Sequence, residues 1–167
     1  MASYLINRIL NKIAFMSPGG YNIRPRLHRL RGVRMGRNVW ISQFVYIDEL
    51  HPEEVTIGDN VTIGLRTSIF THMYWGKRRS EGGYKDVVIG KDAFIGPHCL
   101  ILPGVHVGEG AVVKGGSVLT RNVPAHVFWG PAEPTAIAKV TIPLTAEHSY
   151  DEFVRGLRPI RRAKTDT

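Results

Sequence analysis

His72 is the residue of this chain best placed for proton transfer. It opens a long interruption in an otherwise regular sequence pattern, and the same interruption holds Trp75, Arg78, Arg79 and Tyr84. A neutral imidazole accepts a proton near neutral pH, so it can activate an attacking hydroxyl. The aromatic rings and guanidinium groups are suited to bind a sugar and an anionic group. A surface histidine at the start of a loop is the alternative, and the other histidines carry no comparable signal.

The elements that must position His72 follow from twelve aliphatic residues spaced six apart in three runs. They are Met35, Ile41, Ile47, Ile57, Ile63, Ile69, Ile89, Ile95, Ile101, Val107, Val113 and Leu119. This period fits neither an amphipathic helix nor an alternating strand. It is typical of a β-helix, in which three short strands form one triangular coil, so twelve units predict four coils. Gly follows the aliphatic residue in six units, where we expect it to supply positive φ at the corners.

The step of six is broken twice, and both breaks fall on one edge of the predicted coil. From Ile47 to Ile57 the step is ten, and from Ile69 to Ile89 it is twenty. If the units belong in turn to three faces, both insertions follow the same face, one coil apart. Long loops on a rigid scaffold often carry function. The sequence therefore predicts a protruding loop at 72–86 beside the shorter insertion, with insertions that carry no function as the alternative.

Three carboxylates are candidates to orient the His72 ring through its second nitrogen. Asp48 and Glu49 begin the shorter insertion, one coil earlier on the same face, and Glu81 lies in the longer insertion. We prefer Asp48 as the catalytic partner of His72. A solvated corner acid is the alternative for each of them.

Several segments resemble the hexapeptide-repeat acyltransferases. They are residues 55–64 closing on Thr71-His72, residues 88–97 running on to 101–110, residues 116–125, and Gly130-Pro131-Ala132. Over roughly residues 33–140 the chain is most similar to the sugar and polysaccharide O-acetyltransferases, close to the galactoside and maltose acetyltransferases. The resemblance implies an all-β fold, a parallel left-handed β-helix with short terminal helices. It also implies a homotrimer with active sites between subunits, and it places His72 at the position of the general base.

The resemblance further implies acetyl-CoA as the acyl donor and no metal. The cofactor-binding residues matched in this way are Gly96, Gly115, Gly116, Ser117, Thr120, Arg121 and Lys139. Backbone amides near Gly115 and Gly116 match contacts to pantetheine, and Thr120 and Arg121 match residues near the 3′-phosphate and adenine. Trp129 is a candidate to stack on adenine or to cover the end of the β-helix.

The chain departs from the family pattern at three places, so not every site residue of the family can be assigned to this sequence. Pro97 occupies a position whose backbone N–H the galactoside branch directs at the thioester carbonyl, and proline has no N–H. The tail motif is shortened to Gly130-Pro131-Ala132, which leaves Lys139 as the nearest cation. The unit at 41–46 lacks the acceptor-binding Asn of that branch, and Ser42 or Gln43 is the substitute.

These observations predict an acetyl-CoA-dependent O-acetyltransferase that acts on a hydroxyl of a sugar or glycoconjugate, as in polysaccharide biosynthesis. His72 is the base in a direct transfer, and N-acetylation of an amino sugar is an alternative. A non-catalytic scaffold or partner subunit is a second class, favoured by Pro97 and the shortened tail. A metal enzyme like the γ-class carbonic anhydrases is a third, disfavoured because His98 and His106 lie eight apart on different units.

The N-terminal part differs from the rest in charge. Residues 1–37 hold eight Lys or Arg and no acid, whereas residues 38–147 hold nine basic and eleven acidic residues. Residues 4–15 predict an amphipathic helix that caps the solenoid, with attachment to a membrane surface as the alternative. The basic arm behind it either meets an anionic acceptor or acidic lipid, or is a solvated arm that packs against the trimer. We divide the chain into residues 1–32, the β-helix at 33–140, and a C-terminal part at 141–167 with a helix over 146–157.

Composition is consistent with one globular core. The chain has 167 residues, of which 43% are hydrophobic, and a single cysteine, Cys99, which we expect in the core. The basic charge is not interleaved with aromatic residues, so nucleic-acid binding is disfavoured. The expected location is the cytoplasm, since no export signal or membrane-spanning segment is evident.

Overall fold

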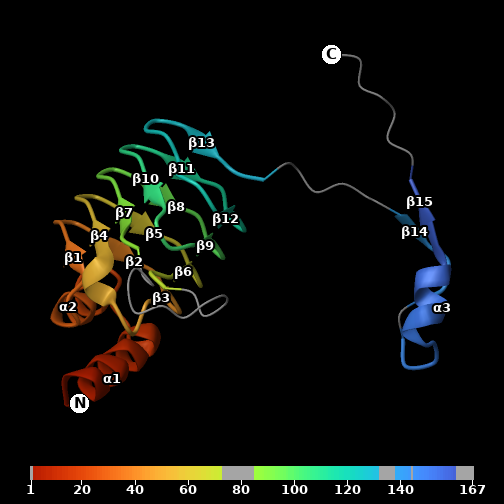
Figure 1. The fold of residues 1–167 in the computed structure, drawn as a ribbon, viewed down its shortest axis with the longest axis horizontal. Helices are drawn as coiled ribbons and strands as arrows, with labels where there is room; N and C mark the ends of the chain where they lie inside the picture. The colour runs from red at the N-terminus through yellow and green to blue at the C-terminus, as the bar shows by residue number, and fades with distance from the viewer. Residues whose placement is uncertain (1, 73–84, 132–137, 144, 161–167) are drawn as a thin grey trace. The chain divides into compact units, whose positions relative to one another are not determined.

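A computed structural model describes residues 2–72, 85–131, 138–143 and 145–160 in two compact units, Met1–Pro131 and Ala132–Thr167 (Figure 1). Within these residues, no helix is both long and apolar enough to cross a membrane.

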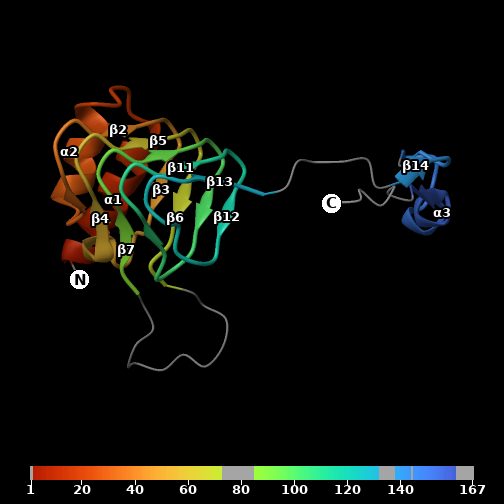
Figure 2. The same ribbon diagram turned by 90° about the horizontal axis from the view of Figure 1, so that it is seen from above.

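The first unit is a left-handed parallel β-helix whose three faces are three parallel sheets (Figures 1 and 2). The sheets have the strand orders β1-β4-β7-β10, β13-β11-β8-β5-β2 and β12-β9-β6-β3. Within β1 to β12 each strand therefore pairs with the strand three positions along the chain, and β13 pairs with β11. The strands are β1 (Arg34–Met35), β2 (Trp40–Ile41), β3 (Tyr46–Ile47), β4 (Val55–Ile57), β5 (Thr62–Ile63), β6 (Ser68–Ile69), β7 (Val87–Ile89), β8 (Phe94–Ile95), β9 (Leu100–Ile101), β10 (His106–Val107), β11 (Val112–Val113), β12 (Val118–Leu119) and β13 (Phe128–Trp129). Strands β1 to β12 form the four predicted coils, and β13 begins a fifth.

The six-residue spacing correctly predicts the core. Eleven of the twelve aliphatic residues are buried with exposed fractions of 0–2%, and Met35 packs against them from the first coil. Like side chains stack in register, as in the pairing of Ile41 with Ile63 and of Ile63 with Ile95. Cys99 is also in this core, as expected, and burial raises the pKa of its thiol.

The six glycines that follow inward aliphatic residues do not supply positive φ, so the reason predicted for them was wrong. Positive φ occurs three residues after the inward aliphatic residue, at Asn60 and His98 for example, whereas none of the six glycines has it. A Cβ on Gly58 would lie 2.5 Å from the backbone nitrogen of Lys91 in the next coil, and one on Gly64 would lie 2.5 Å from that of Pro97. These positions require Gly because adjacent coils approach too closely for any side chain.

Two helices cover the outer edge of the first coil. They are α1 (Ala2–Met16), which confirms the predicted N-terminal helix, and α2 (Ile23–Leu30). Residues 23–30 of the predicted basic arm thus form a helix that packs against the first coil. A first coil has no preceding coil, so it presents a sheet edge with unpaired N–H and C=O groups. The Ile41 N–H donates to the Gly20 carbonyl at 3.0 Å, and the Phe44 N–H to that of Phe15 at 3.0 Å.

The carbonyl groups on this edge accept hydrogen bonds from three arginines, one arginine for each strand of the first coil. Arg24 Nε donates to the Ile41 carbonyl at 2.7 Å, and Arg29 donates to the carbonyls of Met35 and Gly36. Arg31 Nη2 donates to the carbonyls of Ile47 at 3.0 Å and Asp48 at 2.6 Å. Three of the eight basic residues in 1–37 therefore donate hydrogen bonds to the backbone carbonyls of the first coil.

Arg31 is the centre of a buried polar cluster. Its Nε donates to Asn7 Oδ1 and its Nη1 to Asn11 Oδ1, both at 2.7 Å, and Nη1 lies 2.9 Å from His28 Nδ1. Burial, with Arg31 and Arg24 nearby, lowers the pKa of His28 to about 3, so its ring is neutral and Nδ1 accepts. Burial lowers the pKa of Arg31 to about 10, which leaves it charged at neutral pH.

The second unit contains β14 (Ala138–Val140), α3 (Tyr150–Arg155) and β15 (Leu157–Pro159), with β14 and β15 antiparallel. The predicted helix over 146–157 is present but shorter. Ser149 forms a capping box with Glu152, which fixes its start, and Gly156 is the C-cap.

We predict that Arg31→Ala destabilises the protein by about 3 kcal/mol, because four oxygen acceptors, three of them in buried bonds, lose a charged donor. Chemical denaturation followed by circular dichroism measures this. Arg34→Ala is the matched control, since Arg34 is exposed and its Nε bonds only Thr56 Oγ1 at 3.0 Å among the bonds described here; we expect a change below about 0.5 kcal/mol. Equal stability of the two variants would contradict the edge-capping role.

Candidate active site

The two insertions leave the same edge of the β-helix, as predicted. The shorter one follows β3 and contains the 3₁₀ helix Pro52–Glu54, and the longer one follows β6 one coil later. The Asp48 N–H donates to the Ile69 carbonyl at 2.9 Å, which continues the pairing of β3 with β6 beyond their ends. This pairing brings the start of one insertion against the start of the other.

Asp48 and His72 meet at this edge. His72 Nδ1 lies 2.6 Å from Asp48 Oδ2, and the exposed fractions of the two side chains are 11% and 0%. Sequence reasoning had placed these two residues on one edge by counting faces, and the structure brings them into contact. A buried carboxylate this close to an imidazole fixes the proton on Nδ1, so Nε2 is the basic nitrogen.

The Asp48 carboxylate is held by backbone amides as well as by His72. Oδ1 accepts from the N–H groups of Leu50 at 2.8 Å and His51 at 3.3 Å, and Oδ2 accepts from the Thr71 N–H at 2.8 Å. Burial raises the pKa of this carboxyl, but the bonds from Thr71 and Leu50 and the nearby His72 outweigh it, so the pKa lies below its ordinary value. Asp48 is therefore ionised at neutral pH and held in one orientation.

Glu49, another candidate acid, does not share this position. Glu49 Oε1 accepts from Arg8 Nη2 at 3.0 Å on the cap. Glu81 lies outside the described residues, as do Trp75, Arg78, Arg79 and Tyr84. Their predicted roles stay predictions.

His51 was missed by the sequence reasoning. Its ring centre lies 6.3 Å from that of His72 in an edge-on arrangement, its carbonyl accepts from Thr71 Oγ1 at 3.3 Å, and its Nδ1 lies 3.4 Å from Glu53 Oε1. Its place in the shorter insertion was the available signal, because that insertion had been placed beside His72.

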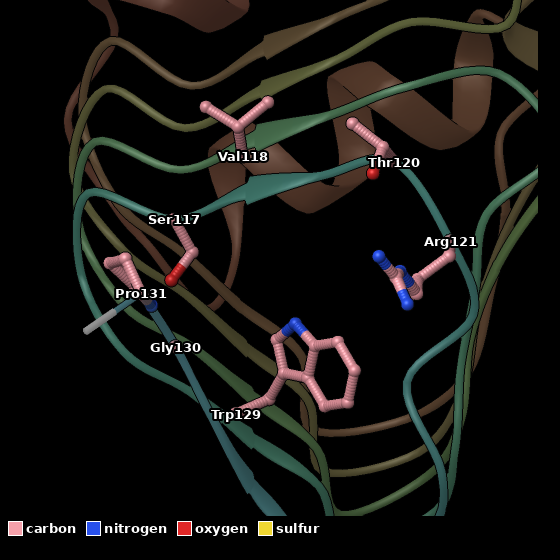
Figure 3. A pocket seen from close by; sticks show the side chains of 7 residues that line it. All are labelled: Ser117, Val118, Thr120, Arg121, Trp129, Gly130 and Pro131. Carbon is pink, nitrogen blue, oxygen red and sulfur yellow. The ribbon is translucent and has the colours of Figure 1, made fainter.

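A second feature is a pocket of about 350 Å³ at the last coil (Figure 3). Its lining residues are Ser117, Val118, Thr120, Arg121, Trp129, Gly130 and Pro131. Figure 3 shows the Arg121 guanidinium and the Trp129 ring directed into the same space from opposite walls. Three of the predicted cofactor-binding residues, Ser117, Thr120 and Arg121, are thus together, and Trp129 joins them. A cation beside a flat aromatic ring is suited to bind an anionic, planar ligand.

The glycines predicted to bind the cofactor differ in whether their backbone N–H groups are already hydrogen-bonded within the β-helix. The Gly96 N–H donates to the Val113 carbonyl and the Gly116 N–H to the Pro97 carbonyl, both at 2.8 Å. These two amides are therefore occupied within the coil. Gly115 stacks on Pro97, where a Cβ would lie 3.1 Å from the Pro97 carbonyl oxygen. Lys139 is exposed on β14, in the second unit.

Among the described residues there is no group of three or more His, Cys, Asp or Glu side chains that could hold a metal ion. His98 is exposed at a corner with φ of 57°, and His106 Nε2 pairs with Asp86 Oδ2 at 3.0 Å.

Comparisons with known proteins agree with this architecture. Residues 86–121 match the family "Bacterial transferase hexapeptide (six repeats)", and residues 54–71 match "Hexapeptide repeat of succinyl-transferase". A putative acetyltransferase of Bacillus subtilis, YvoF, is 35% identical over 59% of this chain and 55% of its own. The galactoside O-acetyltransferase of Escherichia coli is 32% identical over 57% of this chain and 48% of its own. The chain thus spans about half the length of these relatives.

A solved structure is also similar. A hexapeptide-repeat acetyltransferase of Vibrio cholerae, in complex with acetyl coenzyme A, superposes with a TM-score of 0.61 at 26% identity, over 76% of this chain and 81% of that chain.

We predict that Asp48→Asn destabilises the protein by about 2 kcal/mol at pH 7, because an amide group cannot accept all the bonds that the carboxylate accepts. The folded pKa of Asp48 is lowered. Its contribution is therefore present above the unfolded-state pKa of about 3.9 and is lost as the pH falls through the folded pKa. Denaturation at several pH values should show a smaller loss of stability on acidification in the variant.

Asp86→Asn is the matched control, because Asp86 pairs with His106 at the surface, where the side chains are 50% and 48% exposed. We expect it to change stability by less than about 0.5 kcal/mol. The ¹⁵N chemical shifts of the His72 ring report its tautomer directly. A wild-type ring protonated on Nε2 would contradict the orientation described above.

Proposed function

Because the chain is built from the hexapeptide repeats of the bacterial transferases, we propose that it is an acetyl-CoA-dependent acetyltransferase. The acceptor we propose is a hydroxyl of a sugar or glycoconjugate. The observation that carries the proposal is the buried Asp48–His72 pair at the root of the long insertion. The galactoside O-acetyltransferase among the relatives supports the class of acceptor. We place the reaction in the cytoplasm.

The pair supplies proton transfer in the proposed reaction. His72 Nε2 takes the proton of the acceptor hydroxyl while that oxygen attacks the thioester carbonyl. The C–S bond then breaks, and the imidazolium returns the proton to the departing thiolate, so the products are an acetyl ester and a thiol. Asp48 stabilises the imidazolium that forms between these steps and keeps Nε2 directed at the acceptor. An amino sugar would be acetylated on nitrogen by the same steps.

The pocket at the last coil is the proposed site for the nucleotide end of acetyl-CoA. Arg121 would pair with phosphate and Trp129 would stack on adenine, with Thr120 as a hydroxyl partner. Ser117 Oγ donates to the Lys114 carbonyl at 2.5 Å, so Ser117 shapes the wall rather than offering its proton. We further propose a homotrimer with active sites between subunits, as the resemblance to the hexapeptide-repeat acyltransferases implies.

A non-catalytic β-helix subunit is the second candidate function. It is favoured by Pro97, which has no N–H, and by the Gly116 N–H, which the Pro97 carbonyl occupies. Binding of acetyl-CoA distinguishes the two candidates, because a scaffold that has lost the site would not bind it.

We predict that His72→Ala lowers the rate of acetyl transfer by about 10²–10⁴ and leaves the affinity for acetyl-CoA unchanged, because the base acts in the chemical step. Release of free thiol from acetyl-CoA, measured with a panel of sugar acceptors, gives the rate. His98→Asn is the control, since Asn tolerates the positive φ of that exposed corner. Near-full activity of His72→Ala would show that another group is the base.

We predict that Arg121→Ala weakens binding of acetyl-CoA by roughly tenfold, because a charge-assisted bond to phosphate is lost. Calorimetry with CoA and with 3′-dephospho-CoA locates the contact: a loss seen only with CoA places Arg121 at the 3′-phosphate. Arg37→Ala, at an exposed arginine of the first coil that pairs with Asp59, is the control. If the wild-type protein binds neither compound, the scaffold function replaces the enzymatic one.

A further inference from the structure

The helix α1 turns its polar side toward the protein and its apolar side toward solvent. Asn11 is 5% exposed and Ala14 is fully buried. Asn7 Nδ2 donates to the Glu49 carbonyl at 2.9 Å. With the bonds from Arg31 to Asn7 and Asn11, these contacts fix the rotation of the helix about its own axis.

The outward side is an apolar stripe of five large side chains. Its residues and exposed fractions are Leu5 60%, Ile6 56%, Ile9 48%, Ile13 49% and Met16 67%. On an α-helix these positions lie within one face, opposite Asn11 and Ala14. On the neighbouring α2, Leu30 and Ile23 are also exposed, at 73% and 42%. The other side of this helix already packs against the protein. An exposed apolar stripe of this kind therefore indicates a surface that binds another protein or a membrane.

Positive charge accompanies the apolar stripe. Of the eight basic residues in the acid-free segment 1–37, Arg24 and Arg31 are buried in the cap, and the others are exposed. Lys12 lies on α1 beside the stripe, and Arg26 lies on the exposed side of α2. In Figure 1 both helices lie at the first-coil end of the β-helix, away from β13.

The positive charge beside the apolar stripe favours an anionic membrane over a second copy of the chain as its partner. A second copy docked through the same face would bring two acid-free basic surfaces together, which is repulsive. The rest of the first unit offers little compensation, because residues 38–131 hold eight basic and nine acidic residues. An apolar helix face with basic flanks matches the boundary between acyl chains and anionic headgroups in a bilayer.

We propose that the apolar stripe of α1 docks the protein onto a membrane surface rich in anionic lipid. The five apolar side chains enter the boundary between acyl chains and headgroups, and Lys12 and Arg26 contact headgroup phosphates. Docking through α1 is a function separate from the proposed acetyl transfer, and it is tested without any measurement of that activity.

Flotation of the full chain with phosphatidylcholine vesicles, with and without phosphatidylglycerol, tests the proposal. We expect binding only to the anionic vesicles. I9D/I13D should lose at least tenfold in binding, and K12E/R26E roughly tenfold at moderate salt, with a weaker dependence on salt than the wild type. Phe128→Asp is the matched control: Phe128 is 73% exposed on β13, and we expect the wild-type affinity.

Circular dichroism and sedimentation of each variant keep the result interpretable. Failure of the wild-type protein to float with anionic vesicles would overturn the proposal, as would undiminished binding of a folded I9D/I13D variant. A change in oligomeric state caused by I9D/I13D would also overturn it, since the apolar stripe would then lie between copies of the chain.

Discussion

The open edge of the first coil is the constraint on which the rest of the structure depends. A β-helix pairs each coil with the next, so the chain must satisfy the edge where pairing starts. Here three arginines reach the carbonyls of the three strands, and the burial of Arg31 needs the amides of Asn7 and Asn11 and the neutral ring of His28. Arg31 also holds the carbonyl of Asp48, so the cap supports the residue that orients His72. The charged cap, the rotation of α1 and the site are therefore one connected arrangement.

The Asp48–His72 pair is positioned by the scaffold rather than by the loops. Asp48 comes directly after β3, and His72 follows β6 by three residues. The two strands pair with each other, and the Asp48 N–H extends that pairing by one bond. The cost of burying the carboxylate is offset by three backbone amides, two from the shorter insertion and one from Thr71. The register of β3 and β6 therefore sets the position of the pair.

The sequence was sufficient for features that depend on repetition and insufficient for those that depend on single contacts. The spacing of six predicted the inward residues, the three faces and the shared edge of Asp48 and His72, because stacking repeats the same environment. The glycines were found but misexplained, since close approach of coils acts between residues far apart in the chain. The helix α2 and the burial of Arg24 and Arg31 were missed, because a run of arginines gives no sign of which carbonyls it will meet. His51 was missed for the same reason: its contact with His72 crosses between the two insertions.

The separation of the base from the pocket fits the proposed donor. His72 follows the second coil, whereas Arg121 and Trp129 belong to the fourth and fifth, and coils rise by about 4.8 Å each, so the two features lie roughly 10–15 Å apart along the axis. A small acyl donor could not occupy both. A long thioester with a nucleotide at its far end can be held at Arg121 and Trp129 while its reactive carbon lies elsewhere, and binding energy gained far from the reacting bond can then hold that bond against a base. The stiffness of the stacked coils keeps this separation constant, which explains why a β-helix suits transfer from such a donor.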